Sequence, residues 1–428
     1  MKKYYDQVKS LAFSDTAKDT YILFLGNLGS AFWGFLFTLI VARGLSVSDF
    51  GIFSAVLNLV IILSSLADLG ISTGSVNFVA DNFSKGDFKK TDEYIKAAFV
   101  IRVVVVILIS LIVIIAAPFV SEKLLATSDP RMAIWSAVIP IFIFPVFFFQ
   151  YILQAKKQFL QATIYDNSFY VARLAFAFWF YFMGMLTMEH AFWAFGIGFL
   201  VTILLTFVYM KQNFLFSKPT KTEYRNLLKF SSWIAVNRII SSISGKLDVQ
   251  MLAAMMGAVA TGLYSIPSRL SSFIIVLAGS FSSVLATRLA SFNDREKEKS
   301  YIIKSTLALL PITLLLVLWI VIAEPFILFL FGAKYVDSVP VFQALVAAEI
   351  PFLFTVPPVS AIVYSMKKTI YIGTLSFFQI AGIFFLNYYL IPNYGVYGPT
   401  ITLGVTNTIL AIYVWIIVIK YYWGKRLN

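Results

Sequence analysis

The 428-residue chain contains no cysteine and a single histidine, His190. Without cysteine, neither a disulfide framework nor a thiolate metal site can form. One histidine excludes the histidine pairs that bind metals on a helix. The sequence also lacks a glycine-rich loop that would cradle phosphates and a nucleophile elbow. We therefore expect no metal, no organic cofactor and no enzymatic activity.

Charged residues are scarce as well, at 13% of the chain, whereas soluble domains average about 25%. Hydrophobic residues make up 60%, and the mean hydropathy is +0.84. Apolar stretches of about 20 residues, each long enough to cross a bilayer core of about 30 Å, recur along the chain. These features predict an all-α polytopic membrane protein with twelve transmembrane helices. We place them near residues 21–42, 50–72, 98–117, 132–154, 164–184, 190–210, 230–256, 259–287, 302–323, 340–365, 369–391 and 396–419.

Basic residues between the spans fix the expected orientation, because cytoplasmic loops retain Lys and Arg. With the N-terminus inside, most of the 34 Lys and Arg residues face the cytoplasm. The opposite side receives Arg43, Lys123, Arg131 and Lys334. We expect a multi-pass protein of the cytoplasmic (inner) cell membrane with both termini in the cytoplasm. The net charge of +13 is then topogenic and does not indicate nucleic-acid binding.

The chain also repeats itself at a fixed offset. Val41-Ala42 corresponds to Leu252-Ala253, 211 residues later, and Lys156-Lys157 corresponds to Lys367-Lys368. Two homologous six-helix bundles around a central cavity explain this pattern. The expected domains are an N-terminal bundle, a cytoplasmic linker and a C-terminal bundle. They cover 1–210, 211–229 and 230–428.

A few basic side chains fall inside the predicted spans, where an ionisable group is costly and marks a pathway or a partner. They are Arg102, Arg173, Arg238, Lys246 and Arg269. Arg102 lies near the cytoplasmic end of its span, and we expect its side chain to snorkel to the interface. The others predict an anionic substrate in a membrane cavity.

The repeat sharpens this prediction for two arginines. At the offset of 211, Arg238 corresponds to Asn27 and Arg269 corresponds to Asn58. We expect these positions to line a common cavity with one hydrogen-bonding wall and one cationic wall. Buried structural pairing and helix–helix hydrogen bonding are the alternatives. Arg173 is less certain to bind substrate, because its counterpart is the apolar Phe384.

Acidic residues within the spans are the candidates for ion coupling. They are Asp68, Asp248 and Glu349. Each could instead neutralise one of the arginines, and Lys246 could pair locally with Asp248. The sequence leaves both alternatives open, and coupling to H⁺ or to Na⁺ fits equally well.

Two pairs of segments resemble a known family. Ala42–Phe53 (ARGLSVSDFGIF) and Ala67–Gly70 are similar to the opening signature of polysaccharide-unit flippases, the polysaccharide transporter family. Asp248–Leu252 and Gly262–Leu270 resemble the equivalent stretch of the second half in that family. Multidrug exporters and lipid II flippases belong to the same superfamily.

The resemblance implies a flippase that moves polyprenyl-pyrophosphate-linked oligosaccharide units from the inner to the outer leaflet by alternating access. Arg238, Lys246 and Arg269 would then hold the pyrophosphate, and Asn27 and Asn58 would bind sugar hydroxyls. The implied partners are this lipid-linked oligosaccharide, membrane lipids and other polysaccharide-assembly membrane proteins. Related multidrug extruders often carry a coupling acid in the first span, and this chain has none there.

Two alternatives stay open from the sequence. A lipid II-type or multidrug exporter would share the fold, although the basic excess disfavours a pump for cationic drugs. A membrane glycosyltransferase or polymerase would need extramembrane acids or a large outer loop, and neither is found.

Overall fold

The computed structural model describes residues 15–210, 212–292, 294–368 and 370–424. These residues are helical almost throughout and contain no strand. By contacts the chain forms two compact units, which are described separately. Unit 1 comprises residues 1–46, 56–123 and 127–245. Unit 2 comprises residues 47–55, 124–126 and 246–428.

Nine helical segments in the described part of the chain are long and apolar enough to cross a membrane. This confirms an all-α, multi-pass membrane protein. Two of the twelve expected spans are not among the nine, because their helices, Phe159–Phe182 and Lys221–Ser244, carry several polar residues. Two others are joined in the single segment Ile370–Trp423. The exact number of twelve, the inner membrane and the cytoplasmic termini stay predictions.

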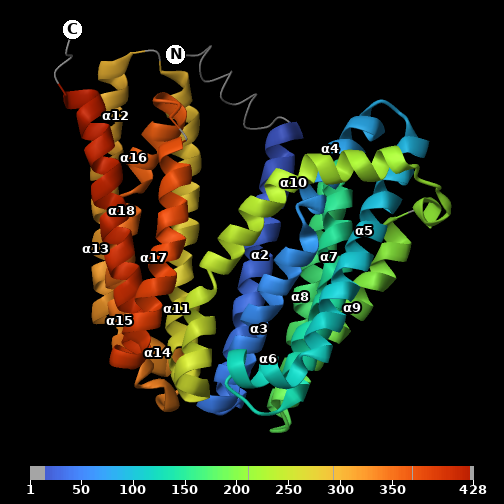
Figure 1. The fold of residues 1–428 in the computed structure, drawn as a ribbon, viewed down its shortest axis with the longest axis horizontal. Helices are drawn as coiled ribbons and strands as arrows, with labels where there is room; N and C mark the ends of the chain where they lie inside the picture. Colours follow the sequence, from blue (N-terminus) through green and yellow to red (C-terminus); the bar gives the residue numbers. More distant parts are fainter. Residues whose placement is uncertain (1–14, 211, 293, 369, 425–428) are drawn as a thin grey trace. The chain divides into compact units, whose positions relative to one another are not determined.

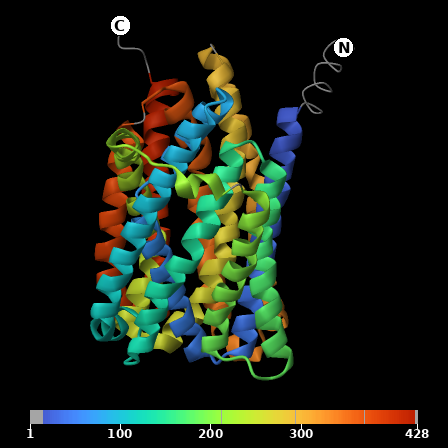
Figure 2. The same ribbon diagram turned by 90° about the vertical axis from the view of Figure 1, so that its right-hand side faces the viewer.

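Unit 1 is a bundle of long helices that run side by side (Figure 1 and Figure 2). Helix α2 packs on α8, α8 on α9, and α7 on α5, α8 and α9. Helix α10 lies obliquely against α4 and α5. The helices of this unit are α2 (Asp15–Gly44), α3 (Val47–Asp68, whose first turns belong to unit 2), α4 (Ile71–Ser84), α5 (Phe88–Ile115), α6 (Ala117–Leu124), α7 (Pro130–Ala155), α8 (Phe159–Phe182), α9 (Met188–Tyr209), η1 (Gln212–Phe216) and α10 (Lys221–Ser244).

Unit 2 is built on α11, which packs against α15 and α17, while α18 covers α15 and α17. Its helices are α11 (Leu247–Ser291), α12 (Arg295–Leu307), α13 (Leu309–Val321), α14 (Ala323–Phe331), η2 (Ala333–Tyr335), α15 (Ser338–Leu353), α16 (Val356–Ser360), η3 (Ala361–Ser365), α17 (Ile370–Tyr394), η4 (Gly395–Tyr397) and α18 (Gly398–Trp423).

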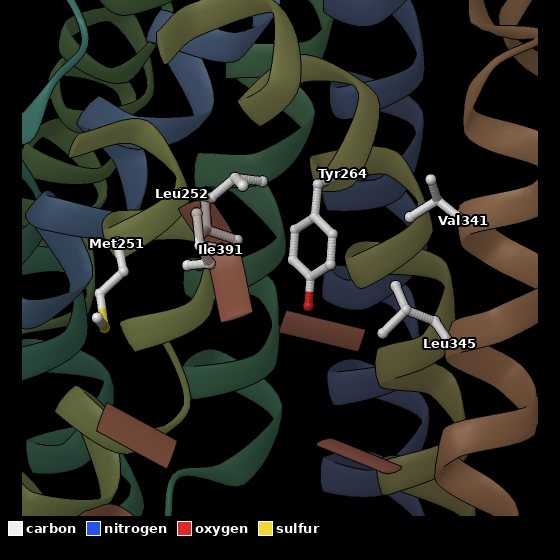
Figure 3. Close-up of a cluster of buried hydrophobic side chains, with 7 residues drawn as sticks. Met251, Leu252, Tyr264, Val341, Leu345 and Ile391 are labelled. Atoms are coloured by element: carbon white, nitrogen blue, oxygen red, sulfur yellow. The ribbon is translucent and has the colours of Figure 1, made fainter. Parts of the chain in front are cut away.

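Helix α11 folds back on itself at Gly257. This glycine has φ 83° and ψ −172°, a conformation that other residues rarely adopt. The Tyr264 hydroxyl donates a 2.8 Å hydrogen bond to Asp248, 16 positions earlier. In a straight helix these residues would be about 24 Å apart. The two arms therefore run back along each other, and they bury Leu252 and Tyr264 beside Val341 of α15 (Figure 3).

The helix order supports the repeat predicted from the sequence. The turn at Gly257 corresponds, at the offset of 211, to the turn between α2 and α3. In both halves a short helix follows the third predicted span. Helix α6 follows α5, and α14 follows the consecutive helices α12 and α13. A lysine with positive φ follows the fourth predicted span in each half, Lys157 in the first and Lys367 in the second. The division into 1–210, 211–229 and 230–428 stays a prediction, since contacts group α10 with unit 1.

The start of α10 is held by a charged capping box. Glu223 accepts hydrogen bonds from the Thr220 N–H at 2.7 Å and the Thr220 hydroxyl at 2.6 Å, and from the Lys90 ammonium at 2.7 Å. Burial alone would raise the pKa of Glu223, but these hydrogen bonds outweigh it and lower the pKa from 4.5 to about 2. The carboxylate therefore anchors α10 on α5 while it is ionised.

This anchor predicts an acid-dependent stability. Because the pKa is depressed in the folded state, the stabilisation is complete above about pH 4.5 and is lost as the pH falls toward 2. Glu223→Gln is expected to lower the free energy of unfolding at pH 7 by about 1 kcal/mol and to reduce the loss on acidification. Thermal unfolding of both purified proteins at pH 7 and pH 3 measures this. An equal loss in the variant would contradict the assignment.

Candidate functional site

A cluster of one acid and two arginines lies in unit 1, with the acid and one arginine buried. Asp68, at the end of α3, is 5% exposed, and Arg102 of α5 is 4% exposed. One oxygen of Asp68 accepts hydrogen bonds from Arg102 and from the Ser72 hydroxyl, and the other accepts from Arg238 at 2.7 Å. Arg102 also donates to the Ser72 hydroxyl at 2.6 Å. Two guanidinium groups against one carboxylate leave the cluster net positive.

The break between α3 and α4 positions this cluster. Leu69 and Gly70 have φ 46° and 69°, so the chain turns sharply directly after Asp68. A Cβ on Gly70 would lie 2.8 Å from the Ser231 carbonyl oxygen of α10, so the glycine permits a close helix approach. Arg238 lies two turns after Ser231 on α10 and forms its ion pair with Asp68 there. The span expected at 50–72 is therefore interrupted at Leu69 and Gly70.

The snorkelling predicted for Arg102 is wrong. Its guanidinium turns inward to Asp68, because a charge paired within the bundle avoids the cost of an unpaired one. Arg238 differs from Arg102, since 39% of its side chain is exposed. Arg238 can therefore keep Asp68 as a partner and still offer donors to an anion.

A polar cavity of about 510 Å³ lies within unit 1, between α2, α7 and α8. Its polar lining comes from amides, hydroxyls and one carboxyl group. These are Asn27, Ser30, Gln150, Tyr151, Gln154 and Asp166.

Asp166 is the buried acid of this cavity, at 5% exposure. One oxygen accepts a 2.5 Å hydrogen bond from the Ser30 hydroxyl, while the other has no hydrogen-bond partner among the described residues. A glycine on α2 lies close to the neighbouring residue Asn167. A Cβ on Gly29 of α2 would lie 2.6 Å from the Asn167 side-chain oxygen of α8, so a larger residue at this position would displace the Asn167 side chain.

Tyr151 connects the cavity to the charged cluster. Its side chain lines the cavity from α7, and its hydroxyl group interacts electrostatically with Arg238. Arg238 and Asn27, two positions singled out from the sequence, are thus linked to one region of unit 1. Asn58 is buried in the same unit, on α3.

Arg173 lies buried on α8 among four aromatic rings. Its guanidinium carbon is 4.2 Å from the ring centroid of Phe37, 4.6 Å from Phe195 and 5.0 Å from Tyr170. Phe169 is the fourth ring, at 5.4 Å. Cation–π contacts of this kind stabilise a buried guanidinium. A role for Arg173 in substrate binding stays a prediction.

The remaining predicted residues belong to unit 2. Lys246 precedes α11 and Asp248 lies in its first turn, bonded to Tyr264. Glu349 is buried on α15. Arg269, on the second arm of α11, is half-buried, with its guanidinium carbon 5.9 Å from the ring centroid of Phe50. The common cavity expected for all these positions, and the coupling role of the acids, stay predictions.

Asp166 and Tyr151 were not selected from the sequence as site residues. The span containing Asp166 was expected to begin at residue 164, which placed this acid at the membrane edge. In the structure α8 begins at Phe159, so Asp166 lies seven residues, or about 10 Å, along the helix. Because Gln158 and Gln161 are polar, hydropathy alone does not show that this helix begins at Phe159.

Comparisons with known proteins agree with this architecture. The family model described as polysaccharide biosynthesis protein matches residues 16–286. Comparison with curated protein sequences finds no match. Among solved structures, an inward-facing MATE family multidrug resistance transporter of the MOP superfamily is similar, with TM-score 0.75 and 15% identity over 92% of this chain and 96% of that chain.

Two further structures share the fold. The lipid II flippase MurJ in an inward closed conformation has TM-score 0.72 and 16% identity, over 94% of this chain and 89% of that chain. A MOP superfamily transporter from Pyrococcus furiosus, described by the reverse polarity of its binding pocket, has TM-score 0.55 and 16% identity, over 96% and 94%. At these identities the similarity establishes the fold.

Proposed function

Because the chain belongs to the polysaccharide biosynthesis protein family, we propose that it is a flippase for lipid-linked oligosaccharides. It would move polyprenyl-diphosphate-linked units from the inner to the outer leaflet by alternating access. Flipping makes and breaks no covalent bond, which fits a chain whose sequence carries no catalytic motif. The fold shared with a lipid II flippase supports a lipid-linked cargo.

The observation that carries this proposal is the excess positive charge at Asp68, Arg102 and Arg238. Arg102 and Asp68 neutralise each other inside the bundle, so Arg238 supplies the additional charge. Its donors fit the oxygens of a diphosphate, because one guanidinium group can bind two phosphate oxygens at once. We assign Lys246 and Arg269 of unit 2 to the same anion, at other stages of its passage. Arg173 stays a further candidate for substrate binding, with four aromatic rings around its guanidinium group.

Coupling to H⁺, Na⁺ or the membrane potential completes the proposal. Asp248 and Glu349 are the better candidates for coupling, because Asp68 is committed to two arginines. No organic cofactor is needed for such coupling. Other polysaccharide-assembly membrane proteins are proposed as partners that supply and receive the cargo.

The proposal predicts a defect in living cells. Removal of the protein is expected to leave the lipid-linked oligosaccharide in the inner leaflet, and the wild-type chain should restore its transfer. Arg238→Ala and Arg269→Ala should each lower the transfer rate at least about tenfold, since each loses a charge-assisted contact. Radiolabelled lipid-linked intermediates, assayed for accessibility from each side, measure this.

Arg225→Ala is the matched control, because this arginine is exposed on the same helix as Arg238. It should transfer cargo at the wild-type rate. The proposal fails if both Arg238→Ala and Arg269→Ala are folded and transfer the cargo normally. Resistance to cationic drugs without any change in the lipid-linked pool would indicate a multidrug exporter instead.

A further inference from the structure

The lining of the cavity in unit 1 indicates what it binds. Asn27, Gln150 and Gln154 have amide groups that both donate and accept hydrogen bonds. Among the described residues that line it, none is basic. We propose that this cavity binds an uncharged sugar ring, the one attached to the diphosphate of the lipid-linked cargo. This inference rests on the proposed function and names the part of the cargo that unit 1 recognises.

Asp166 has an unused hydrogen-bonding capacity that a sugar would satisfy. The Asp166 side chain lines the cavity, and its second oxygen is buried without a hydrogen-bond partner among the described residues. Buried polar atoms of this kind are rare, because leaving one unsatisfied is costly. Neighbouring sugar hydroxyls are donors that fit a carboxylate oxygen. Ser30 already fixes the orientation of the carboxylate by its 2.5 Å hydrogen bond.

Aromatic rings supply the second element of sugar recognition. Phe147, Tyr151 and Tyr170 line the same cavity. Such rings offer flat apolar faces for the C–H groups of a sugar, and the two phenols add hydroxyls beside them. The volume of about 510 Å³ lies within the range of about 300–1,000 Å³ found for small-molecule pockets.

Tyr151 places the cavity beside the proposed diphosphate site. Its hydroxyl group interacts electrostatically with Arg238, and its side chain lines the cavity. In a lipid-linked oligosaccharide the first sugar is bonded directly to the diphosphate. A diphosphate at Arg238 would therefore place that first sugar near Tyr151. The diphosphate site at Arg238 and the sugar site in the cavity are thus neighbours, as the diphosphate and the first sugar are in the cargo.

A hydrated monovalent cation is the competing occupant, since Asp166, Ser30 and Asn27 all offer oxygens. The described residues contain no group of three or more His, Asp or Glu side chains that could hold a metal ion. Hard cations prefer several carboxylate and carbonyl oxygens. One carboxylate among amides and aromatic rings fits a sugar better, and the experiment separates the two.

Saturation-transfer NMR on the purified full chain in detergent micelles tests the proposal. The probes are free glucose, galactose, N-acetylglucosamine and N-acetylgalactosamine. At least one should bind saturably, and Asp166→Asn should weaken its binding at least about tenfold. Gln150→Ala should weaken the same sugar and keeps the test decisive if Asp166→Asn does not fold. Ser168→Ala, on α8 but outside the cavity lining, should bind like the wild type.

The outcomes separate this inference from the proposed function. Saturable sugar binding that depends on Asp166 supports the site even if no lipid-linked oligosaccharide is transported. Failure of all four sugars to bind, while transport persists, overturns the site and leaves the proposed function standing. Sodium binding measured by ²³Na NMR that disappears in Asp166→Asn, with no sugar bound, would also overturn it and assign a cation site.

Discussion

Asp68→Asn is expected to lower the free energy of unfolding by about 3–5 kcal/mol, because it leaves two guanidinium groups without their counter-charge. Arg102 is only 4% exposed, and Arg238 loses its 2.7 Å ion pair. Asparagine keeps the volume of the side chain, so the loss measures charge and not packing. Denaturant or thermal unfolding of the purified protein in detergent gives the value.

Asp81→Asn provides the matched control on the neighbouring helix α4. Asp81 pairs with Lys85 at 2.6 Å, but both side chains are more than half exposed, so we expect a loss below about 1 kcal/mol. The double variant Asp68→Asn/Arg102→Leu should lose less than the sum of the two single changes, because it removes the buried charge together with its partner. Equal stability of Asp68→Asn and Asp81→Asn would refute the ion cluster.

Gly262→Ala is expected to cost about 3 kcal/mol or more, a large effect for one methyl group. The start of α3 crosses the second arm of α11 at this point in unit 2. A Cβ on Gly262 would collide with the backbone carbonyl of Val47, and one on Gly51 would collide with the carbonyl of Ala258. Backbone atoms cannot swing aside like a flexible side chain, so the helices must separate and lose packing.

Gly279→Ala on the same helix isolates this steric effect. Nothing lies within 4 Å of a Cβ at Gly279, so alanine there should be neutral or slightly stabilising. The comparison needs the unfolding midpoints of both variants and the yield of folded protein in size-exclusion chromatography. If Gly262→Ala were as stable as Gly279→Ala, the close crossing of α3 and α11 would be wrong.

Hydropathy and the repeat could predict much of the fold. Apolar runs depend on local composition, so the long helices and their order follow from the sequence alone. The turn at Gly257 was expected near residues 256–259 for the same reason. The lengths of the polar helices α8 and α10 were harder to predict from the sequence. Asp166, Glu223 and Arg238 reduce the hydropathy on which the predicted boundaries depend.

The candidate site could be predicted only in part. Arg238 stood out because a charge inside a span is costly. Its partner could not be selected, since Asp68 lies 170 positions away and three acids were available. Burial of Arg102 depends on where α3 ends, which hydropathy does not show. Asp166 and Tyr151 can be recognised as site residues only from the cavity that they line with Asn27.

The central claim is that this chain translocates a diphosphate-linked oligosaccharide lipid through a site that includes Arg238. The most direct measurement uses purified protein in liposomes that carry a defined polyprenyl-diphosphate oligosaccharide, with its appearance in the opposite leaflet followed over time. We predict transfer well above that of protein-free vesicles, at the wild-type rate for Arg225→Ala and at least about tenfold slower for Arg238→Ala. Transfer no faster than in empty liposomes, or undiminished in Arg238→Ala, would contradict the account.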